Sequence, residues 1–425
     1  MSKKIAFASS FVVGLMIALE TLTTCSGPQI EAAEVQVNPG QSIQAAIDAA
    51  ADLDLIIVHQ GTYHENITFM GKAITVRSTD PENPDIIAAT IIDGSRSGSV
   101  ITFDQEEGVN SVLAGITVQN GQAEHGGGGV LCKESSPSII NCIIKENAAG
   151  HGGGGICCME SSAVITHCVV EKNAAGHGGG GICCKESSIS ITGCLIFENS
   201  AGHCGGGILC KEAQPAITDC LIHNNKAERC GGGILCKESS PTISRCTISD
   251  NSAQRGGGGI GCESDSSPVI INCLMNRNSA DKGGAISCTE NSAPVAINCT
   301  ISENSANSSG GGLYSHESTP SVTNCILWAN SPAEIYVQSG TPAVTYSDIQ
   351  DGYAGLGNIH ADPRFVDSAA GDYHLKAGSP CIDTGLNTDV PAEDKDGTPR
   401  PQDGDGDGTA TYDMGAYEYV APVRQ

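Results

Sequence analysis

Alternating aspartates near the end of the chain have the spacing of calcium ligands. Single glycines separate Asp403, Asp405 and Asp407, and hard carboxylate oxygens at the first, third and fifth positions of a loop suit Ca²⁺. A complete EF-hand would need an acidic residue at the twelfth position, where Met414 stands. We therefore expect a looser calcium site, completed by Asp413 or by Glu418. The alternative is an acidic, flexible loop that binds no ion.

Histidines recur at a fixed interval and offer a second chemistry. His125, His151, His177 and His203 are 26 residues apart, and Arg229 and Arg255 continue the same series. Stacked imidazoles are able to bind a metal ion, which would suit a periplasmic protein that handles metals. The replacement of histidine by arginine favours a simple basic stripe instead.

Cysteines set the same interval over most of the chain. The first series has a period of 26 residues, with Tyr314 expected in the eighth place, and comprises Cys132, Cys158, Cys184, Cys210, Cys236, Cys262 and Cys288. The second keeps the period with one extra residue before Cys273 and comprises Cys142, Cys168, Cys194, Cys220, Cys246, Cys273, Cys299 and Cys325. Asparagines follow the second series by five residues, from Asn147 to Asn330, and we expect their side-chain amides to hydrogen-bond to one another along the stack. A repeat of this length indicates stacked supersecondary units, one coil per repeat.

Each repeat has the pattern of short strands and none of an amphipathic helix. In the repeat over residues 231–255, Ile234 and Cys236 are two apart, as are Cys246 and Ile248. In an extended strand both members of such a pair point to the same face. Runs of glycine and a Ser-Ser-Pro sequence fit turns between the strands. We predict an all-β fold, a right-handed parallel β-helix with 26-residue coils, a short N-terminal capping helix over residues 42–51 and an irregular β C-terminal cap.

The repeat resembles that of the pectin-lyase-like β-helix superfamily, in bacterial proteins whose coils carry Ile, Cys and Asn at these spacings before a Gly-Gly-Gly-Ile turn. The segments that resemble the first coils of that superfamily are residues 37–40, 42–50, 57–58, 61–67 and 71–76. Near the other end, the segments that resemble the choice-of-anchor Q domain of cell-surface proteins are residues 362–367, 371–375, 378–385, 396–400 and 413–418. The resemblance implies a fold and a surface location, but no single activity.

The N-terminus predicts export. Lys3 and Lys4 precede an apolar run over residues 5–19, which is typical of a secretory signal. Cleavage near Ala32 or Ala33 would release a secreted or cell-surface protein with no transmembrane segment, and lipidation at Cys25 is the alternative. We divide the chain into a signal peptide over 1–32, an N-terminal cap with irregular first coils over 33–125, regular coils over 126–330 and a choice-of-anchor-Q-like domain over 331–425.

Most of the 21 cysteines are expected to be buried thiols, although exported proteins usually form disulfides. In-register neighbours of a parallel sheet keep their Cβ atoms about 4.8 Å apart, whereas a disulfide needs about 3.8 Å. Stacked thiols on separate coils also do not enclose a tetrahedral metal ion. Cys204 and Cys230 lie in the glycine turn, where Cβ directions are freer, and they are the first candidates for a disulfide. Cys157 and Cys183, which are expected to point outward, are weaker candidates.

Charge and composition restrict the function. The net charge of −26 disfavours nucleic acid, anionic membranes and bare polyuronates as partners. A column of glutamates from Glu134 to Glu238 lies beside lysines such as Lys185, which indicates a self-neutralising edge. No convergent set of acid, base and cation is recognisable. We expect a monomeric structural, adhesive or glycan-binding protein that contacts glycans or cell-surface components without turning them over, and the alternative is a polysaccharide lyase or hydrolase.

Overall fold

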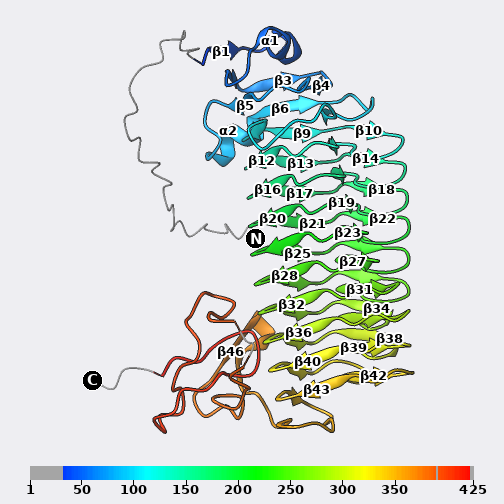
Figure 1. Ribbon diagram of the computed structural model, residues 1–425, viewed down its shortest axis with the longest axis vertical. Helices are drawn as coiled ribbons and strands as arrows, with labels where there is room; N and C mark the ends of the chain where they lie inside the picture. The colour runs from blue at the N-terminus through cyan, green and yellow to red at the C-terminus, as the bar shows by residue number, and fades with distance from the viewer. Residues whose placement is uncertain (1–31, 389–390, 422–425) are drawn as a thin grey trace, which may run out of the picture.

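The computed structural model describes residues 32–388 and 391–421, and its main body is the expected right-handed parallel β-helix. Coils stack along one axis in four parallel sheets (Figure 1). The signal peptide, its cleavage site and Cys25 lie outside the described residues. Among those described, no helix has the length and apolar character needed to span a membrane.

The longest sheet, sheet A, has 13 strands. These are β1 (Glu34–Val37), β2 (Leu55–Val58), β5 (Thr75–Ser78), β8 (Val112–Ala114), β12 (Ser138–Ile140), β16 (Val164–Thr166), β20 (Ser190–Thr192), β24 (Ala216–Thr218), β28 (Thr242–Ser244), β32 (Val269–Ile271), β36 (Val295–Ile297), β40 (Ser321–Thr323) and β43 (Ala343–Thr345).

Sheet B has 12 strands and follows sheet A along each regular coil. These are β3 (Gly61–Tyr63), β6 (Thr90–Asp93), β9 (Thr117–Gln119), β13 (Ile143–Lys145), β17 (Val169–Glu171), β21 (Leu195–Phe197), β25 (Leu221–His223), β29 (Thr247–Ser249), β33 (Leu274–Asn276), β37 (Thr300–Ser302), β41 (Ile326–Trp328) and β44 (Asp348–Ile349).

Sheet C has 11 strands and opens each regular coil after the glycine turn. These are β4 (Ile67–Thr68), β7 (Ile101–Phe103), β11 (Val130–Lys133), β15 (Ile156–Met159), β19 (Ile182–Lys185), β23 (Ile208–Lys211), β27 (Ile234–Lys237), β31 (Ile260–Glu263), β35 (Ile286–Cys288), β39 (Leu313–Ser315) and β42 (Ile335–Val337).

Sheet D has eight strands and closes each regular coil ahead of the glycine turn. These are β10 (Gln122–Ala123), β14 (Ala148–Ala149), β18 (Ala174–Ala175), β22 (Ser200–Ala201), β26 (Lys226–Ala227), β30 (Ser252–Ala253), β34 (Ser279–Lys282) and β38 (Ser305–Ser309).

Single residues in the left-handed region make the bends between strands. In the coil that begins with β11, Glu134, Asn141 and Glu146 have φ of 52°, 53° and 56°. One residue turns the chain sharply at each bend, and the next side chain then points into the interior. Side chains other than glycine tolerate this conformation at a cost of about 1–2 kcal/mol, which the hydrogen bonds of the repeated bend offset.

The residue after each bend builds an interior ladder. The asparagine ladder is the most regular: Asn199 Nδ2 donates to Asn225 Oδ1 over 3.0 Å, and the Asn199 amide nitrogen donates to the same oxygen over 3.1 Å. Thiols of the second cysteine series donate to backbone carbonyls, as Cys220 does to Thr218 over 3.3 Å. The structural roles expected for both series are confirmed.

The first cysteine series also lies in the interior, and all seven members have 0% exposure. Register pairs Cys158 with Cys184 and Cys184 with Cys210. The eighth place belongs to Ser315, which pairs with Cys288, and Tyr314 pairs with Ser287 on the outward side. The expectation for Tyr314 was wrong because the register shifts by one residue at a bulge between β34 and β38.

Two short helices lie at the N-terminal end. The expected capping helix is α1 (Ile43–Ala49), which begins after the N-cap Ser42 and buries Ile43 and Ile47 against the first coil. A second helix, α2 (Pro84–Ala89), begins after Asn83 and was not predicted. Together they leave the fold almost entirely β.

The β-helix continues past the boundary expected at residue 330. Strands β42, β43 and β44 extend sheets C, A and B in parallel register. The chain then turns back, and residues 351–388 and 391–421 lie beside the last coils in Figure 1. The regular elements there are β45 (Phe365–Asp367), the 3₁₀ helix η1 (Ser368–Ala370) and β46 (Asp372–Leu375). We call residues 351–388 and 391–421 the C-terminal segment.

Candidate functional site

A groove runs along sheet C and the glycine turn that precedes it. Its volume is about 750 Å³. Side chains from successive coils line it, from His125 at one end to Glu290 at the other. The groove therefore follows the axis of the β-helix, and equivalent positions along it repeat at the coil spacing of about 4.8 Å.

The wall on the glycine-turn side is the histidine column. Ring centroids of His125 and His151 are 5.8 Å apart, those of His151 and His177 are 5.0 Å apart, and those of His177 and His203 are 4.8 Å apart. Arg229 and Arg255 continue the same wall. The sequence predicted this stripe, and the structure adds that it borders a groove.

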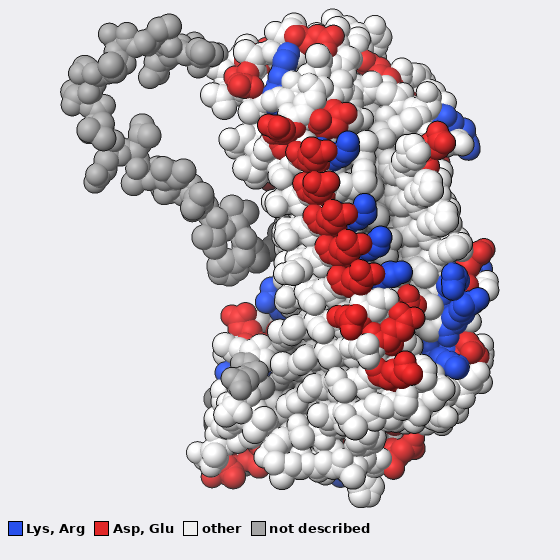
Figure 2. Space-filling model, turned by 45° about the vertical axis from the view of Figure 1, so that its right-hand side comes forward, with Lys and Arg blue, Asp and Glu red and all other residues white. Residues whose placement is uncertain are grey.

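Lysines of sheet C form the opposite wall. Lys185, Lys211 and Lys237 line the groove, and each is followed by a glutamate of the next column. Lys185 Nζ lies 3.0 Å from a Glu186 oxygen, and the corresponding distance from Lys211 to Glu212 is 3.2 Å. Figure 2 shows the acidic column with basic side chains along one side of it. The predicted self-neutralising edge is therefore present, with its basic members turned toward the groove.

Thiols and apolar side chains make the floor of the groove. Cys157 and Cys183 occupy the outward position of β15 and β19, and Leu209 and Leu235 take the same position in the next two coils. Glycine in the turn leaves room for the sulfurs. A Cβ atom on Gly152 would lie 3.0 Å from the Cys183 Sγ atom.

Cys204 and Cys230 also line the groove, and both are free thiols in the structure. The disulfide expected between them is not formed there. Their backbones make a parallel bridge that continues the bridges of Gly152 and Gly178. The turns are therefore paired by backbone bridges, and this pairing keeps the two Cα–Cβ bonds parallel. The Cβ directions are not freer here than in a strand, contrary to what we expected from the sequence.

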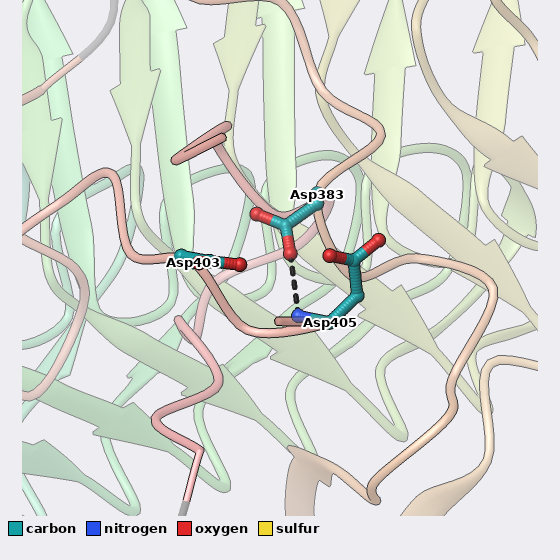
Figure 3. Close-up of side chains that lie close together, drawn as sticks. All are labelled: Asp383, Asp403 and Asp405. Atoms are coloured by element: carbon teal, nitrogen blue, oxygen red, sulfur yellow. Dashed lines mark hydrogen bonds between the residues drawn. The ribbon is translucent and has the colours of Figure 1, made fainter. Parts of the chain in front are cut away.

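The predicted calcium ligands are only partly brought together. Asp403 and Asp405 converge with Asp383, and one oxygen from each lies within 4.8 Å of the other two (Figure 3). This is the only group of three such ligand side chains among residues 32–388 and 391–421. Asp383 Oδ2 accepts hydrogen bonds from the amides of Gly404 and Asp405, over 2.9 and 2.7 Å.

The other two predicted ligands have different roles. Asp407 caps its own loop by accepting from the Thr409 amide over 2.7 Å. Asp413 is buried and accepts from the amides of Asp383 and Tyr419 over 2.8 and 2.6 Å. Burial raises the pKa of Asp413 to about 8. Calcium binding stays a prediction, now centred on Asp383, Asp403 and Asp405. Asp383 was missed because it lies 20 residues upstream of the alternating aspartates.

Buried charges of the C-terminal segment were also missed. Arg400 is buried, its Nε atom lies 3.3 Å from a Glu418 oxygen, and its Nη2 atom donates to the Gly415 carbonyl over 2.9 Å. Burial raises the pKa of Glu418. These residues do not belong to any sequence repeat, so their ion pair could not be predicted from the sequence.

Comparisons with known proteins agree with this architecture. A family model described as a right-handed beta helix region matches residues 180–349. The crystal structure of pectate lyase Pel9A aligns with a TM-score of 0.52 and 13% identity, over 91% of this chain and 96% of that one. No protein of curated function is significantly similar in sequence.

Two further solved structures have lower scores. The A-module of the mannuronan C-5 epimerase AlgE6 from Azotobacter vinelandii has a TM-score of 0.39 and 12% identity, over 76% of this chain and 94% of that one. Pectin methylesterase from carrot has a TM-score of 0.30 and 12% identity, over 79% and 86%. At identities this low, the comparisons show the fold alone.

Proposed function

We propose that this protein is an exported or cell-surface β-helix that binds an extended glycan along its groove without turning it over. The observation that carries the proposal is the groove itself, which presents the same kinds of side chain at one-coil intervals. A ligand with its own repeat can then make equivalent contacts on several coils.

The groove walls are suited to oxygen-rich ligands. Imidazole, guanidinium and ammonium groups are hydrogen-bond donors, and they occupy both sides of the groove, as His177 and Lys211 do. The hydroxyl and carboxylate oxygens of a saccharide are matching acceptors. Because the lysines are partly neutralised by neighbouring glutamates, the groove favours a neutral or sparsely charged chain over a dense polyanion.

The absence of turnover is supported by the composition of the groove. Glycan cleavage on a β-helix needs an acid, a base and often a cation held around one bond. The carboxylates that line this groove are Glu263 and Glu290, which lie on neighbouring coils at one end. The three converging aspartates belong to the C-terminal segment and are not among the lining residues.

The location of the protein rests on the ends of the chain. The basic residues and apolar run of the first 19 residues support export, and the motifs between residues 362 and 418 that resemble a choice-of-anchor Q domain support association with a cell surface. A fixed shaft would then present the groove to glycans of the same or another cell.

Binding to defined oligosaccharides tests the proposal. We expect wild-type protein to retain neutral or sparsely charged oligosaccharides in a glycan screen and in titration calorimetry, and His177→Ala with Lys211→Ala to weaken binding at least tenfold. Lys172→Ala is the matched control, because this lysine is also paired with glutamate, 3.5 Å from Glu171, but does not line the groove. No retained glycan, or equal losses in the groove and control variants, would refute a groove that binds glycans.

A further inference from the structure

Two pairs of cysteines on adjacent coils line the same groove. Cys157 pairs in register with Cys183 on neighbouring strands of sheet C, and Cys204 forms a parallel bridge with Cys230 in the turn. All four are free thiols. Unlike the interior ladders, all four line the groove, where Cys204 and Cys230 are half-buried and Cys157 and Cys183 keep 3% and 7% exposure.

The spacing within each pair suits an ion with two ligands. When the Cα–Cβ bonds of the two cysteines are parallel, their Cβ atoms are about 4.8 Å apart. A disulfide needs a Cβ–Cβ distance of about 3.8 Å, so these atoms are too far apart to form one. A metal–thiolate bond is about 2.3 Å long, so an ion midway between two sulfurs needs them about 4.6 Å apart. Sulfurs on adjacent coils have this separation when the Cα–Cβ bonds are parallel and the two side chains adopt the same χ1 rotamer.

An ion that requires more ligands finds none arranged for it. Zinc takes four ligands in a tetrahedron. The only group of three converging His, Cys, Asp or Glu ligands in the described part of the chain is the aspartate group of the C-terminal segment. Soft thiolate ligands favour Cu(I), a monovalent ion that is stable with two ligands in a line.

Neighbouring cations favour the charge of such a complex. Each ion would displace two thiol protons to solvent, and two thiolates with one monovalent cation carry a net charge of −1. Arg229 and Lys185 line the same groove as the four thiols, so basic side chains lie near both pairs.

We propose that the pairs Cys157–Cys183 and Cys204–Cys230 each bind one soft monovalent cation, Cu(I) in particular, between two sulfurs one coil apart. The proposal does not rest on glycan binding, although both ligands would use the same groove. Stacked thiols do not enclose a tetrahedral ion, but an ion with two ligands needs no enclosure.

Anaerobic competition for Cu(I) tests the proposal. Fully reduced protein is titrated against a coloured Cu(I) chelator, without glycan, and the protons released are counted in weakly buffered solution. Wild-type protein should take up two ions and release two protons for each. Cys157→Ser with Cys183→Ser, and separately Cys204→Ser with Cys230→Ser, should each leave one ion.

The variant with all four serines should take up none, and its circular dichroism spectrum reports whether it is folded. Cys381→Ser is the matched control, because Cys381 is a buried thiol outside the groove whose Sγ atom donates to Asp348, and this variant should still bind two ions. No uptake by wild-type protein would overturn the proposal, and so would unchanged uptake by the folded four-serine variant.

Discussion

The regular coils over residues 126–330 and the C-terminal segment are stabilised in opposite ways. The coils repeat a few uncharged interior side chains, mostly isoleucine, cysteine and asparagine, each supported by its copy one coil away. The C-terminal segment repeats nothing and buries charged groups, including Arg400, Asp394, Asp413 and Glu418. Stability of the coils should therefore be spread evenly over many contacts, whereas that of the segment depends on a few.

The two regions meet at a column of bends. Asn272, Asn298 and Asn324 follow sheet A in the last coils, and their Nδ2 atoms donate to the carbonyls of Glu393, Asp413 and Leu386. In earlier coils other residues, such as His167 and Asp219, hold this position. The bend after sheet A therefore has two roles. In the earlier coils it is part of the surface, and in the last coils it is the edge against which the C-terminal segment packs.

The largest effect is expected from Arg400→Met. Removing the guanidinium leaves Glu418 and the neighbouring Asp394 buried without a counter-charge, which should destabilise the C-terminal segment by about 3–5 kcal/mol. The single tryptophan, Trp328, packs against the segment, so its fluorescence reports the loss during denaturant unfolding.

Arg364→Met is the matched control for that experiment. Its Nη1 atom donates to the Gly378 carbonyl at the surface, so its loss should change stability by less than about 1 kcal/mol. Equal effects of the two substitutions would show that buried charge does not decide the stability of this segment.

A smaller effect is expected inside the coils. Asn225→Ala removes the acceptor for the Asn199 side chain and backbone and the donor to Asn251, which should cost about 2–3 kcal/mol. Asn224→Gly is the control, because its φ of 54° suits glycine. Unfolding followed by circular dichroism should show the loss for Asn225 alone. A loss below about 0.5 kcal/mol would mean that the ladder is not a principal source of stability.

Above about pH 7 the pH dependence should come mainly from the C-terminal segment, because the buried Glu334 of the last coils, whose pKa is raised to about 7, acts at lower pH. The hydrogen bond with Asp396 raises the pKa of His374 from 6.5 to about 9, and burial raises that of Asp413 from 3.8 to about 8. Both groups hold protons more tightly in the folded state, so their stabilising contribution is present at low pH and is lost as pH rises. For His374 the loss runs from about pH 6.5 to about pH 9.

Thermal unfolding between pH 6.5 and 9 tests this difference. The melting temperature reported by Trp328 should fall with rising pH, and the β-sheet signal of the coils should change little. Substitution His374→Gln should flatten the upper part of the profile. A melting temperature that rises over this range would contradict the assignment.

Periodicity explains how much the sequence revealed. The 26-residue interval predicted the coil, the inward cysteines and the asparagine ladder. Each prediction was secure because the same residue type recurs at the equivalent position of many repeats. It failed at Tyr314, where one inserted residue shifts the register. The interval gave no information about Asp383 or Arg400. Their contacts are with residues about 20 positions away in the sequence, and these contacts do not recur from coil to coil. The column Asn272, Asn298 and Asn324 was the one signal available for docking of the C-terminal segment.

Calcium should give the smallest effect, and only in the C-terminal segment. An ion that binds the native state alone raises stability, by about 2.7 kcal/mol at 100 times its dissociation constant and by less near that constant. Calcium should raise the melting temperature reported by Trp328, and Asp405→Ala should remove the gain. Asp407→Ala should keep it, because Asp407 is not in the converging group. No shift in wild-type protein would leave an acidic loop without an ion.

Retention of intact ligand tests the central claim most directly. Purified protein is incubated with calcium and with oligosaccharides that it retains, together with pectin, polygalacturonate and alginate, and the chains are then analysed by mass spectrometry and for new reducing or unsaturated ends. We predict that bound chains are recovered at their original length with no new ends. If wild-type protein produced shortened or unsaturated chains and the Glu263→Gln variant did not, the claim would be contradicted and the groove would be identified as a catalytic site.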